Sequence, residues 1–352
     1  MSPRVFLGWL VVTVVTVVLT VIVGIGKETA SFDLVKREPV FDALRSAPNS
    51  AAQIKIKSRF DAFTMNKGEA GWVTPDRNNY PIDEADIRRL VAGLSDMRYV
   101  ERKTADPGRF YRLEVQDIDE EFSDSAYVKV TGTGGEVLAE AIIGRPSARF
   151  FDGRVSGTYI REPGTNNVWL VSGVTNVQTR LIPWLQRDII RIAANQVASV
   201  SIGTGEGGYT LARKGPSDKA FTINGAPKGR ELNPSRATSV SRALASVELE
   251  DVRPRGEIEL PTDATVATIV TFDGITVGVR LAEVDRKKWA NFDVSYTGDP
   301  SDQSEAANTA RTMVKEINAR VGAWTYWVPS ATYGNLTRSL EDMLVPKEGN
   351  KS

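Results

Sequence analysis

The fold predicted from this sequence depends on two stretches, QIKIKSRFDAFTMNK at residues 53–67 and SVSIGTGEGGYTLAR at residues 199–213. In both, apolar and polar residues alternate, which is typical of half-buried strands joined by short polar turns. The stretches also match each other at one constant offset, for example where Ile54 aligns with Val200. Two copies of one structural unit are the simplest interpretation, and chance similarity between two αβ segments of similar order is the alternative.

A helix is expected after the strands in each copy. Asp83 is the predicted N-cap in the first copy, whereas Asn233 is the N-cap in the second and Pro234 takes the first helical position. Asp and Asn accept hydrogen bonds from the unpaired N–H groups of a first turn, and proline has no N–H to leave unpaired there. The expected apolar positions are Ile87, Leu90, Val91 and Leu94 in the first helix and Ala237, Val240, Leu244 and Val247 in the second.

Further strands are expected after each helix. Residues 127–131 and 137–143 are joined by a glycine-rich turn, and residues 265–271 and 276–281 are joined through Asp273-Gly274. Asp-Gly is a strong hairpin signal because glycine readily adopts positive φ. Each copy therefore predicts a mostly antiparallel sheet with one helix laid on it.

The segment between the copies is expected to hold one more hairpin, at 157–172, and then a short amphipathic helix that carries Trp184. After the second copy, the apolar spacing of residues 301–321 predicts a helix, and residues 324–328 predict a final strand. The predicted organisation is a first unit at 51–180, a connecting helix at 181–195, a second unit at 196–330 and a C-terminal amphipathic segment and tail at 331–352.

The start of the chain is a run without a charged residue, from Val5 to Gly26. A helix of about 20 apolar residues crosses a hydrocarbon core of about 30 Å. We therefore expect a transmembrane anchor at 5–26, after a cytoplasmic tail at 1–4 and before a linker at 27–50. A cleaved signal peptide is the alternative, although its apolar core is usually shorter. The anchor residues are represented by Val5, Trp9, Val15, Ile22 and Gly26.

The complete fold-class prediction is thus α+β, with one N-terminal transmembrane helix followed by two similar, mostly antiparallel sheet-plus-helix units produced by internal duplication. Charge does not fix the orientation, since Arg4 precedes the run and Lys27 follows it. Large domains translocate largely regardless of their charge. The expected location is the bacterial cytoplasmic (inner) membrane, crossed once, with the bulk of the chain on the periplasmic or extracytoplasmic side.

The composition limits the chemistry that the chain can perform. Its 352 residues include neither Cys nor His, which excludes the usual zinc ligands, disulfides, a Cys nucleophile and the commonest general base. Lys plus Arg and Asp plus Glu each number 44, so no net charge favours nucleic acid. We expect no enzyme activity, no catalytic or metal-binding residue and no cofactor, with a carboxylate-based hydrolase as the alternative.

Three motifs are candidate sites. Glycine-rich residues 203–208 precede a strand-like segment rather than a helix, so they predict a flexible hairpin and not a dinucleotide loop. Acidic residues 117–124 lack the glycine and the terminal ligand of a calcium loop, so a solvated loop is expected and cation binding is the alternative. The tryptophans are expected in the core or between domains, with an aromatic ligand platform as the alternative. The possible interaction residues are Trp72, Trp169 and Trp184.

A set of short motifs spread over nearly the whole chain resembles a known bacterial family. The motifs are Trp72-Val-Thr-Pro-Asp-Arg77, Arg88-Arg89-Leu90, Lys103-Thr-Ala-Asp-Pro107, Val168-Trp-Leu-Val171 and the ending from Asn318 to Leu344. Together they look like a domain-of-unknown-function family of single-span envelope proteins found beside gliding-motility-type ABC transporter components. The resemblance implies an accessory subunit of such a transporter, and it implies no catalytic residue.

The expected function is therefore a non-enzymatic, membrane-anchored accessory or binding subunit of an envelope complex. Its expected partners are the membrane and the permease and ATPase subunits of an ABC transporter, and an anchor would raise its local concentration near them. The alternative is an envelope scaffold that binds peptidoglycan, lipid or another envelope protein without a transporter.

Overall fold

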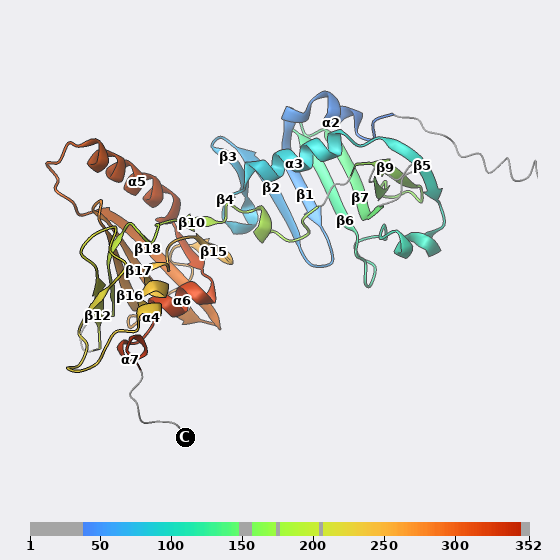
Figure 1. Ribbon diagram of the computed structural model, residues 1–352. Coiled ribbons are helices and arrows are strands. Elements are labelled where there is room, and N and C mark those ends of the chain that lie inside the picture. Colours follow the sequence, from blue (N-terminus) through green and yellow to red (C-terminus); the bar gives the residue numbers. More distant parts are fainter. Residues whose placement is uncertain (1–37, 148–156, 174–176, 204–206, 346–352) are drawn as a thin grey trace, which may run out of the picture. The chain divides into compact units, whose positions relative to one another are not determined.

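The computed structural model describes residues 38–147, 157–173, 177–203 and 207–345 (Figure 1). The chain divides into two units that each have their own internal contacts. Unit 1 comprises the residues up to 73 together with 84–184, and unit 2 comprises 74–83 together with the residues from 185. Each unit is built on one large antiparallel sheet.

The sheet of unit 1 grows from the alternating stretch. In β1 (Ala51–Lys57), Ile54 is fully buried and its polar neighbours are not. On one side β1 pairs with β2 (Ala62–Gly68), which places Ile54 opposite Met65, and on the other side it pairs with β6 (Ala126–Gly132). Since successive side chains of a strand point to opposite faces, the alternation buries one face of this sheet.

Five further strands complete this sheet within unit 1. They are β3 (Gly71–Thr74), β5 (Tyr99–Thr104), β7 (Val137–Ser147), β8 (Gly157–Arg161) and β9 (Val168–Ser172). The strands of unit 1 lie in the order β3-β2-β1-β6-β7-β8-β9-β5. Most neighbours are consecutive hairpins, but β5 lies at the edge beside β9, a strand that comes much later in the chain.

Two helices accompany this sheet. The longer, α3 (Glu84–Ser95), buries all four apolar positions that the sequence predicted for it, so this helix is confirmed. The shorter, α2 (Asp42–Ser46), packs against β7 and α3, and its Leu44 is fully buried. Short 3₁₀ turns complete the unit, namely η1 (Pro48–Ser50), η3 (Pro107–Arg112) and η4 (Ile182–Trp184).

Unit 2 contains a second large sheet and a small one. The large sheet consists of β11 (Val197–Ile202), β12 (Tyr209–Ala212), β13 (Thr222–Asn224), β15 (Asp251–Pro254), β16 (Thr265–Thr271), β17 (Ile275–Val284), β18 (Lys287–Tyr296) and β19 (Trp324–Trp327). Its order is β13-β12-β11-β16-β17-β18-β19-β15. The small sheet pairs β10 (Asp188–Ile190) with β14 (Val247–Glu248).

The eight strands of unit 1 have the same order as the eight strands of the large sheet in unit 2, with β11 in the place of β1, β16 in the place of β6 and β15 in the place of β5. The registers agree as well, because Val200 lies opposite Leu211 in unit 2 as Ile54 lies opposite Met65 in unit 1. The two stretches that match in the sequence therefore occupy equivalent positions in the two sheets.

The other elements of unit 2 are helices, a 3₁₀ turn and one short strand. Asn233 caps α4 (Pro234–Ser241) by accepting hydrogen bonds from two backbone N–H groups of the first turn, as predicted. The long helix α5 (Glu305–Val321) packs against β17 and β18. The remaining elements are η2 (Pro75–Arg77), β4 (Tyr80–Pro81), α6 (Ser330–Leu336) and α7 (Leu340–Met343).

The predicted fold class is wrong as stated. The described residues form three antiparallel sheets with few helices, so β-structure dominates instead of the expected α+β mixture. No helix in this described part of the chain is long and apolar enough to span a membrane, contrary to the transmembrane helix in the prediction. The predicted anchor at 5–26, with Val5, Trp9, Val15, Ile22 and Gly26, lies outside the described residues.

Two connecting segments also differ from expectation. Residues 38–50 belong to unit 1 through α2 and η1, although the whole segment 27–50 was predicted to be a linker. The connecting helix predicted at 181–195 is absent, and η4 and β10 lie there instead. A continuous α-helix is disfavoured here because Pro183 has no N–H to donate and disfavours a helical conformation in the residue before it. Further along the segment, Ile189 and Ile190 are both buried in a strand. Periodicity alone does not separate a short apolar strand from a helix.

Candidate binding site

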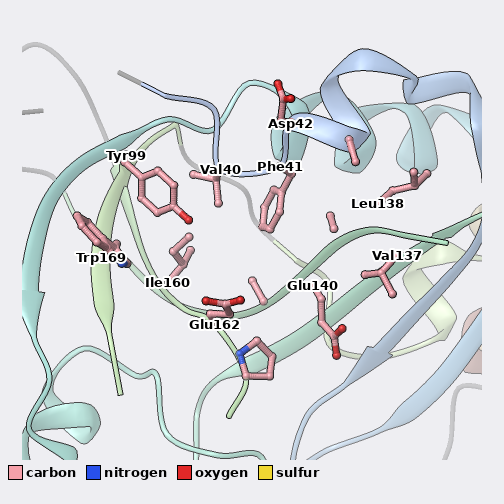
Figure 2. Close-up of a pocket in the computed structure, with 14 residues that line it drawn as sticks. Val40, Phe41, Asp42, Tyr99, Val137, Leu138, Glu140, Ile160, Glu162 and Trp169 are labelled. Carbon is pink, nitrogen blue, oxygen red and sulfur yellow. The ribbon is translucent and has the colours of Figure 1, made fainter. Parts of the chain in front are cut away.

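Unit 1 contains a cavity of about 430 Å³, here called the first hollow, lined by residues of α2, β5, β7, β8 and β9. Figure 2 shows the ring of Phe41 and the hydroxyl of Tyr99 directed into the hollow, with the carboxylate of Glu162 facing them from the opposite side. Small and aliphatic residues of β7 and β8 form its apolar wall, among them Leu138 and Ile160. The polar and aromatic lining residues are Phe41, Asp42, Tyr99, Glu140, Glu162 and Trp169.

An aromatic pair stands at one side of this hollow because β5 joins the sheet beside β9. In that pairing Tyr99 lies opposite Val171 and Arg102 lies opposite Trp169. The rings of Tyr99 and Trp169 meet edge to face, with centroids 4.9 Å apart and planes inclined by 62°. Such a T-shaped contact is a favoured aromatic geometry that fixes both rings in place.

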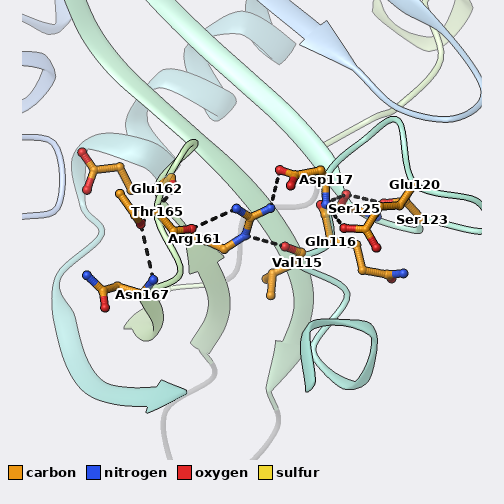
Figure 3. A network of polar contacts seen from close by, with 10 residues as sticks. All are labelled: Val115, Gln116, Asp117, Glu120, Ser123, Ser125, Arg161, Glu162, Thr165 and Asn167. Atoms are coloured by element: carbon orange, nitrogen blue, oxygen red, sulfur yellow. Dashed lines mark hydrogen bonds and ion pairs between the residues drawn. The ribbon is translucent and has the colours of Figure 1, made fainter. Parts of the chain in front are cut away.

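The turn that carries Glu162 is held by its neighbour Arg161. The guanidinium of Arg161, only 2% exposed, donates to the carbonyl of Val115 at 2.8 Å and to that of Thr165 at 3.0 Å. It also donates to a carboxylate oxygen of Asp117 at 2.6 Å (Figure 3). Figure 3 shows the side chains of Arg161 and Glu162 leaving the turn in opposite directions. The buried cation is therefore committed to structure and does not reach the hollow.

The charges around the hollow are mainly negative. Burial raises the pKa of Tyr99, and the charges of Glu162 and Glu38 raise it further, so its hydroxyl stays protonated. The negative charge of Glu140 is compensated, because the hydroxyl of Tyr127 donates a hydrogen bond to its carboxylate at 2.6 Å and the ammonium of Lys129 lies 3.2 Å from it. The Tyr127 hydrogen bond and Lys129 lower the pKa of Glu140 against the opposing effect of burial.

A second hollow of about 640 Å³ lies elsewhere in unit 1, with Trp72 and apolar residues of α3 in its wall. Its charged residues have both signs, and Arg88 of α3 pairs there with Glu84 at 3.3 Å. Lys67 donates to the carbonyl of Asn49 at 3.4 Å. This hollow therefore has no single charge preference.

The chain matches a known protein family. A family model described as a domain of unknown function, DUF4340, matches residues 72–267, more than half of the chain. The chain belongs to the DUF4340 family. Neither a curated protein nor a solved structure matches it.

The DUF4340 segment contains the three tryptophans that the sequence suggested for interaction, but the structure places them apart. Trp169 lines the first hollow and Trp72 lines the second. Trp184 is buried, and its indole N–H donates to the carbonyl of Gln178 at 2.9 Å. Two of the three therefore border cavities, whereas Trp184 belongs to the core.

The acidic stretch at 117–124 also lies within the DUF4340 segment, and its side chains support the fold. Asp117 pairs with Arg161, and Asp124 pairs with Arg59 at 2.8 Å. Over the described ranges, no group of three or more acidic residues is placed to hold a metal ion. The glycine-rich residues 203–208 lie between β11 and β12, as predicted for a hairpin, although 204–206 fall outside the described residues.

Sequence reasoning missed Phe41, Tyr99 and Glu162 as site residues. Their convergence depends on the β5–β9 pairing and on the packing of α2 against β7, neither of which is local in sequence. No strand was predicted around Tyr99, and Phe41 lay in the predicted linker, so no local signal marked either residue. The Glu162 turn itself was predicted, but not the direction of its carboxylate.

In unit 2, the charged side chains that could form a site are paired with one another and stabilise the fold. Asp251, in β15, pairs with Arg77 at 2.8 Å and with Arg253 at 2.9 Å. Burial alone would raise the pKa of this carboxyl, but the hydrogen bonds from Arg77 and the Val252 N–H, with the charges of Arg77 and Arg253, lower it. Tyr80 donates to the carbonyl of Gln186 at 3.0 Å. The carboxylate of Asp251 and the hydroxyl of Tyr80 therefore each have a partner within the fold.

Proposed function

We propose that this DUF4340 protein is a non-enzymatic accessory or binding subunit of an envelope complex. The proposed complex is an ABC transporter of the gliding-motility-associated type, and its permease and ATPase subunits are the proposed partners. The family resemblance supports the choice of partner, and the first hollow supports the choice of a binding role. The proposed location of both units is the extracytoplasmic side of the bacterial cytoplasmic membrane.

The observation that carries this proposal is the first hollow. Its volume lies within the usual range of ligand sites, about 300–1,000 Å³, and its wall combines apolar residues with a few polar groups. Partly exposed rings and a carboxylate border it, whereas the buried ionic groups Arg161 and Asp251 already have partners. Such a wall suits recognition of another molecule better than bond cleavage, which would need an activated nucleophile or a paired acid and base.

Co-purification tests the proposal. The full chain, carrying a C-terminal affinity tag and expressed from its own locus, would be isolated in a mild detergent, and the co-purifying proteins identified by mass spectrometry. Recovery of a permease and an ATPase of one ABC transporter is expected. Reproducible absence of both, under conditions that keep other membrane complexes intact, would contradict the proposal and favour a scaffold without a transporter.

Two variants connect the outcome with the hollow. Trp169→Ala removes one ring of the aromatic pair, and Tyr111→Ala removes an exposed ring that does not line the hollow. The first variant is expected to lower recovery of the partners and the second to leave it unchanged. A C-terminal reporter enzyme that is active only outside the cytoplasm tests the proposed location, and an inactive but stably produced fusion would contradict it.

A further inference from the structure

The first hollow has an uncompensated negative charge. Three of its lining residues are acidic, Asp42, Glu140 and Glu162, and none of its described lining residues is Lys or Arg. Glu140 already has Lys129 and Tyr127 as partners. Within the described part of the chain, no ion pair is formed by the side chain of Asp42 or Glu162. A ligand that brings a positive charge would therefore gain a counter-ion here without displacing one.

The nearest buried cation is turned away from this charge. Arg161 precedes Glu162 directly, but its guanidinium lies over the ring of Phe110, 4.8 Å from the centroid, and donates to Val115, Thr165 and Asp117 (Figure 3). Since it is 2% exposed and fully used there, it does not compensate Glu162. The fold thus separates these adjacent opposite charges and leaves the negative one at the hollow.

Aromatic rings stand opposite this carboxylate. Phe41, Tyr99 and Trp169 border the hollow, and Tyr99 and Trp169 are locked edge to face at 4.9 Å. An aromatic face attracts an organic cation through its quadrupole, and apolar stems pack well against such rings. Burial and the nearby carboxylates raise the pKa of Tyr99, so this residue adds no further negative charge at neutral pH.

A metal ion suits this lining less well. Calcium takes six to eight oxygen ligands and magnesium demands near-octahedral oxygen coordination. The hollow instead offers separate carboxylates beside rings and aliphatic residues such as Leu138 and Ile160. That combination is complementary to a cation that carries its own apolar part.

We propose that the first hollow binds an organic cation, an alkylammonium or guanidinium group on a short apolar stem. Glu162 is the counter-ion, the rings of Tyr99 and Trp169 contact the cation and its stem, and the apolar wall of β7 and β8 receives the rest of the stem. This deepens the proposed function by naming the ligand chemistry of the hollow. It rests on that function only for the source of the cation, either a basic side chain of a partner or a free amine.

The test uses the purified full chain labelled with 5-fluorotryptophan. The sequence has seven tryptophans, and the fluorine resonance of Trp169 is assigned as the one that Trp169→Phe removes. The probes are n-butylammonium and n-butylguanidinium, with n-butanol and butyrate as the neutral and anionic controls. For ligands of this size we expect saturable shifts of the Trp169 resonance with dissociation constants of about 1–20 mM for the two cations.

Variants connect the response with Glu162. Glu162→Gln keeps the shape and removes the charge, so it should weaken cation binding about three- to tenfold. Glu162→Lys places a cation in the site and should abolish the response. Glu121→Gln, an exposed acid that does not line the hollow, is the matched control and should bind as the original chain does. Circular dichroism of each variant verifies that it is folded.

Three results would overturn the inference. The first is the absence of a saturable response to either cation up to about 100 mM, a concentration at which even very weak fragments are detected. The others are a response to n-butanol equal to that of the cations, and unchanged binding in folded Glu162→Gln.

A further titration, with acetylated Gly-Lys-Gly amide, distinguishes the two possible sources of the cation. Binding tighter than that of n-butylammonium assigns a basic side chain of a partner, and weaker binding assigns a free amine. Because this titration needs no partner, its failure is distinguishable from a failure of the co-purification experiment.

Discussion

Replacing Arg161 by Met should destabilise unit 1, because the guanidinium links three chain segments at the base of the Glu162 turn. Met retains much of the aliphatic volume but cannot donate hydrogen bonds. The carbonyls of Val115 and Thr165 lose their donor, and the contact with the ring of Phe110 loses its charge. Asp117 is largely exposed and its carboxylate is hydrated by water in the variant, so the loss of its ion pair with Arg161 costs little stability.

The magnitude follows from burial. An unsatisfied buried carbonyl costs about 1–3 kcal/mol, and a cation over a ring contributes about 0.5–1 kcal/mol or more. Val115 is fully buried whereas Thr165 is partly exposed, so most of the cost arises at Val115. We expect a total loss of about 2–4 kcal/mol in the stability of unit 1.

Hydrogen exchange of the β8 and β9 amides is the suitable assay, because two units need not unfold together and one global transition would mix them. The expected loss corresponds to protection reduced about 30- to 1,000-fold. Arg109→Met is the matched control, since Arg109 forms an exposed ion pair with Asp106, and the protection of the β8 and β9 amides in this variant should change little. Protection within about threefold of the original in Arg161→Met would refute the assignment of a structural role to this buried arginine.

Three further outcomes are expected. The stability of unit 2 should fall as the pH falls below about 4, because the folded-state pKa of Asp251 is lowered; denaturant titrations of Asp251→Asn should show a smaller fall. Tyr80→Phe should lower the free energy of unfolding by about 1 kcal/mol, because it removes the hydrogen bond to Gln186. Burial raises the pKa of Tyr80 to about 12, so this loss, measured by urea unfolding, should not change between about pH 6 and 9. Ile54→Ala and Val200→Ala should each cost about 2–4 kcal/mol, and hydrogen exchange should locate each loss in a different unit.

Several strands were predictable from the sequence because one of their faces is buried. In β1 and β11 the apolar positions recur with period two, and the burial of Ile54 and Val200 follows that pattern. Turn chemistry helped as well, since Asp273-Gly274 marks the β16–β17 turn and Gly274 has a φ of 83°. These signals are local, so they need no knowledge of tertiary structure.

Helices and connections were less predictable. Leu181, Trp184 and Leu185 follow a helical spacing and all three are buried, yet Trp184 lies in the short 3₁₀ turn η4 and the two leucines flank that turn instead of continuing a helix. The α2 segment is only five residues long, which is too short for periodicity to identify, and its helix depends on tertiary packing. Helical content and the linker were therefore predicted wrongly for the same reason, namely that short apolar segments take their structure from their neighbours.

The site was the least predictable part because non-local contacts assemble it. Composition gave equal weight to Trp72, Trp169 and Trp184. Burial alone does not separate them, because Trp72 and Trp184 are both buried, and only the positions of the two hollows show which tryptophans border a cavity. A carboxylate such as Glu162 has no local motif, and its value as a counter-ion depends on the opposite direction taken by Arg161. Recognition chemistry of this kind is visible only once strand pairing is known.

The shared strand order suggests why unit 1 is the unit with this hollow. In unit 1, β8 and β9 are joined by a short turn that carries Glu162. In unit 2, the corresponding strands β18 and β19 are joined by a longer segment that includes α5, and this helix packs against β17 and β18 (Figure 1). One connection thus adds a helical cover and the other leaves an acidic turn beside an aromatic pair. Two sheets with the same strand order can therefore have different roles, because α5 stabilises unit 2 whereas the short turn of unit 1 leaves room for a ligand.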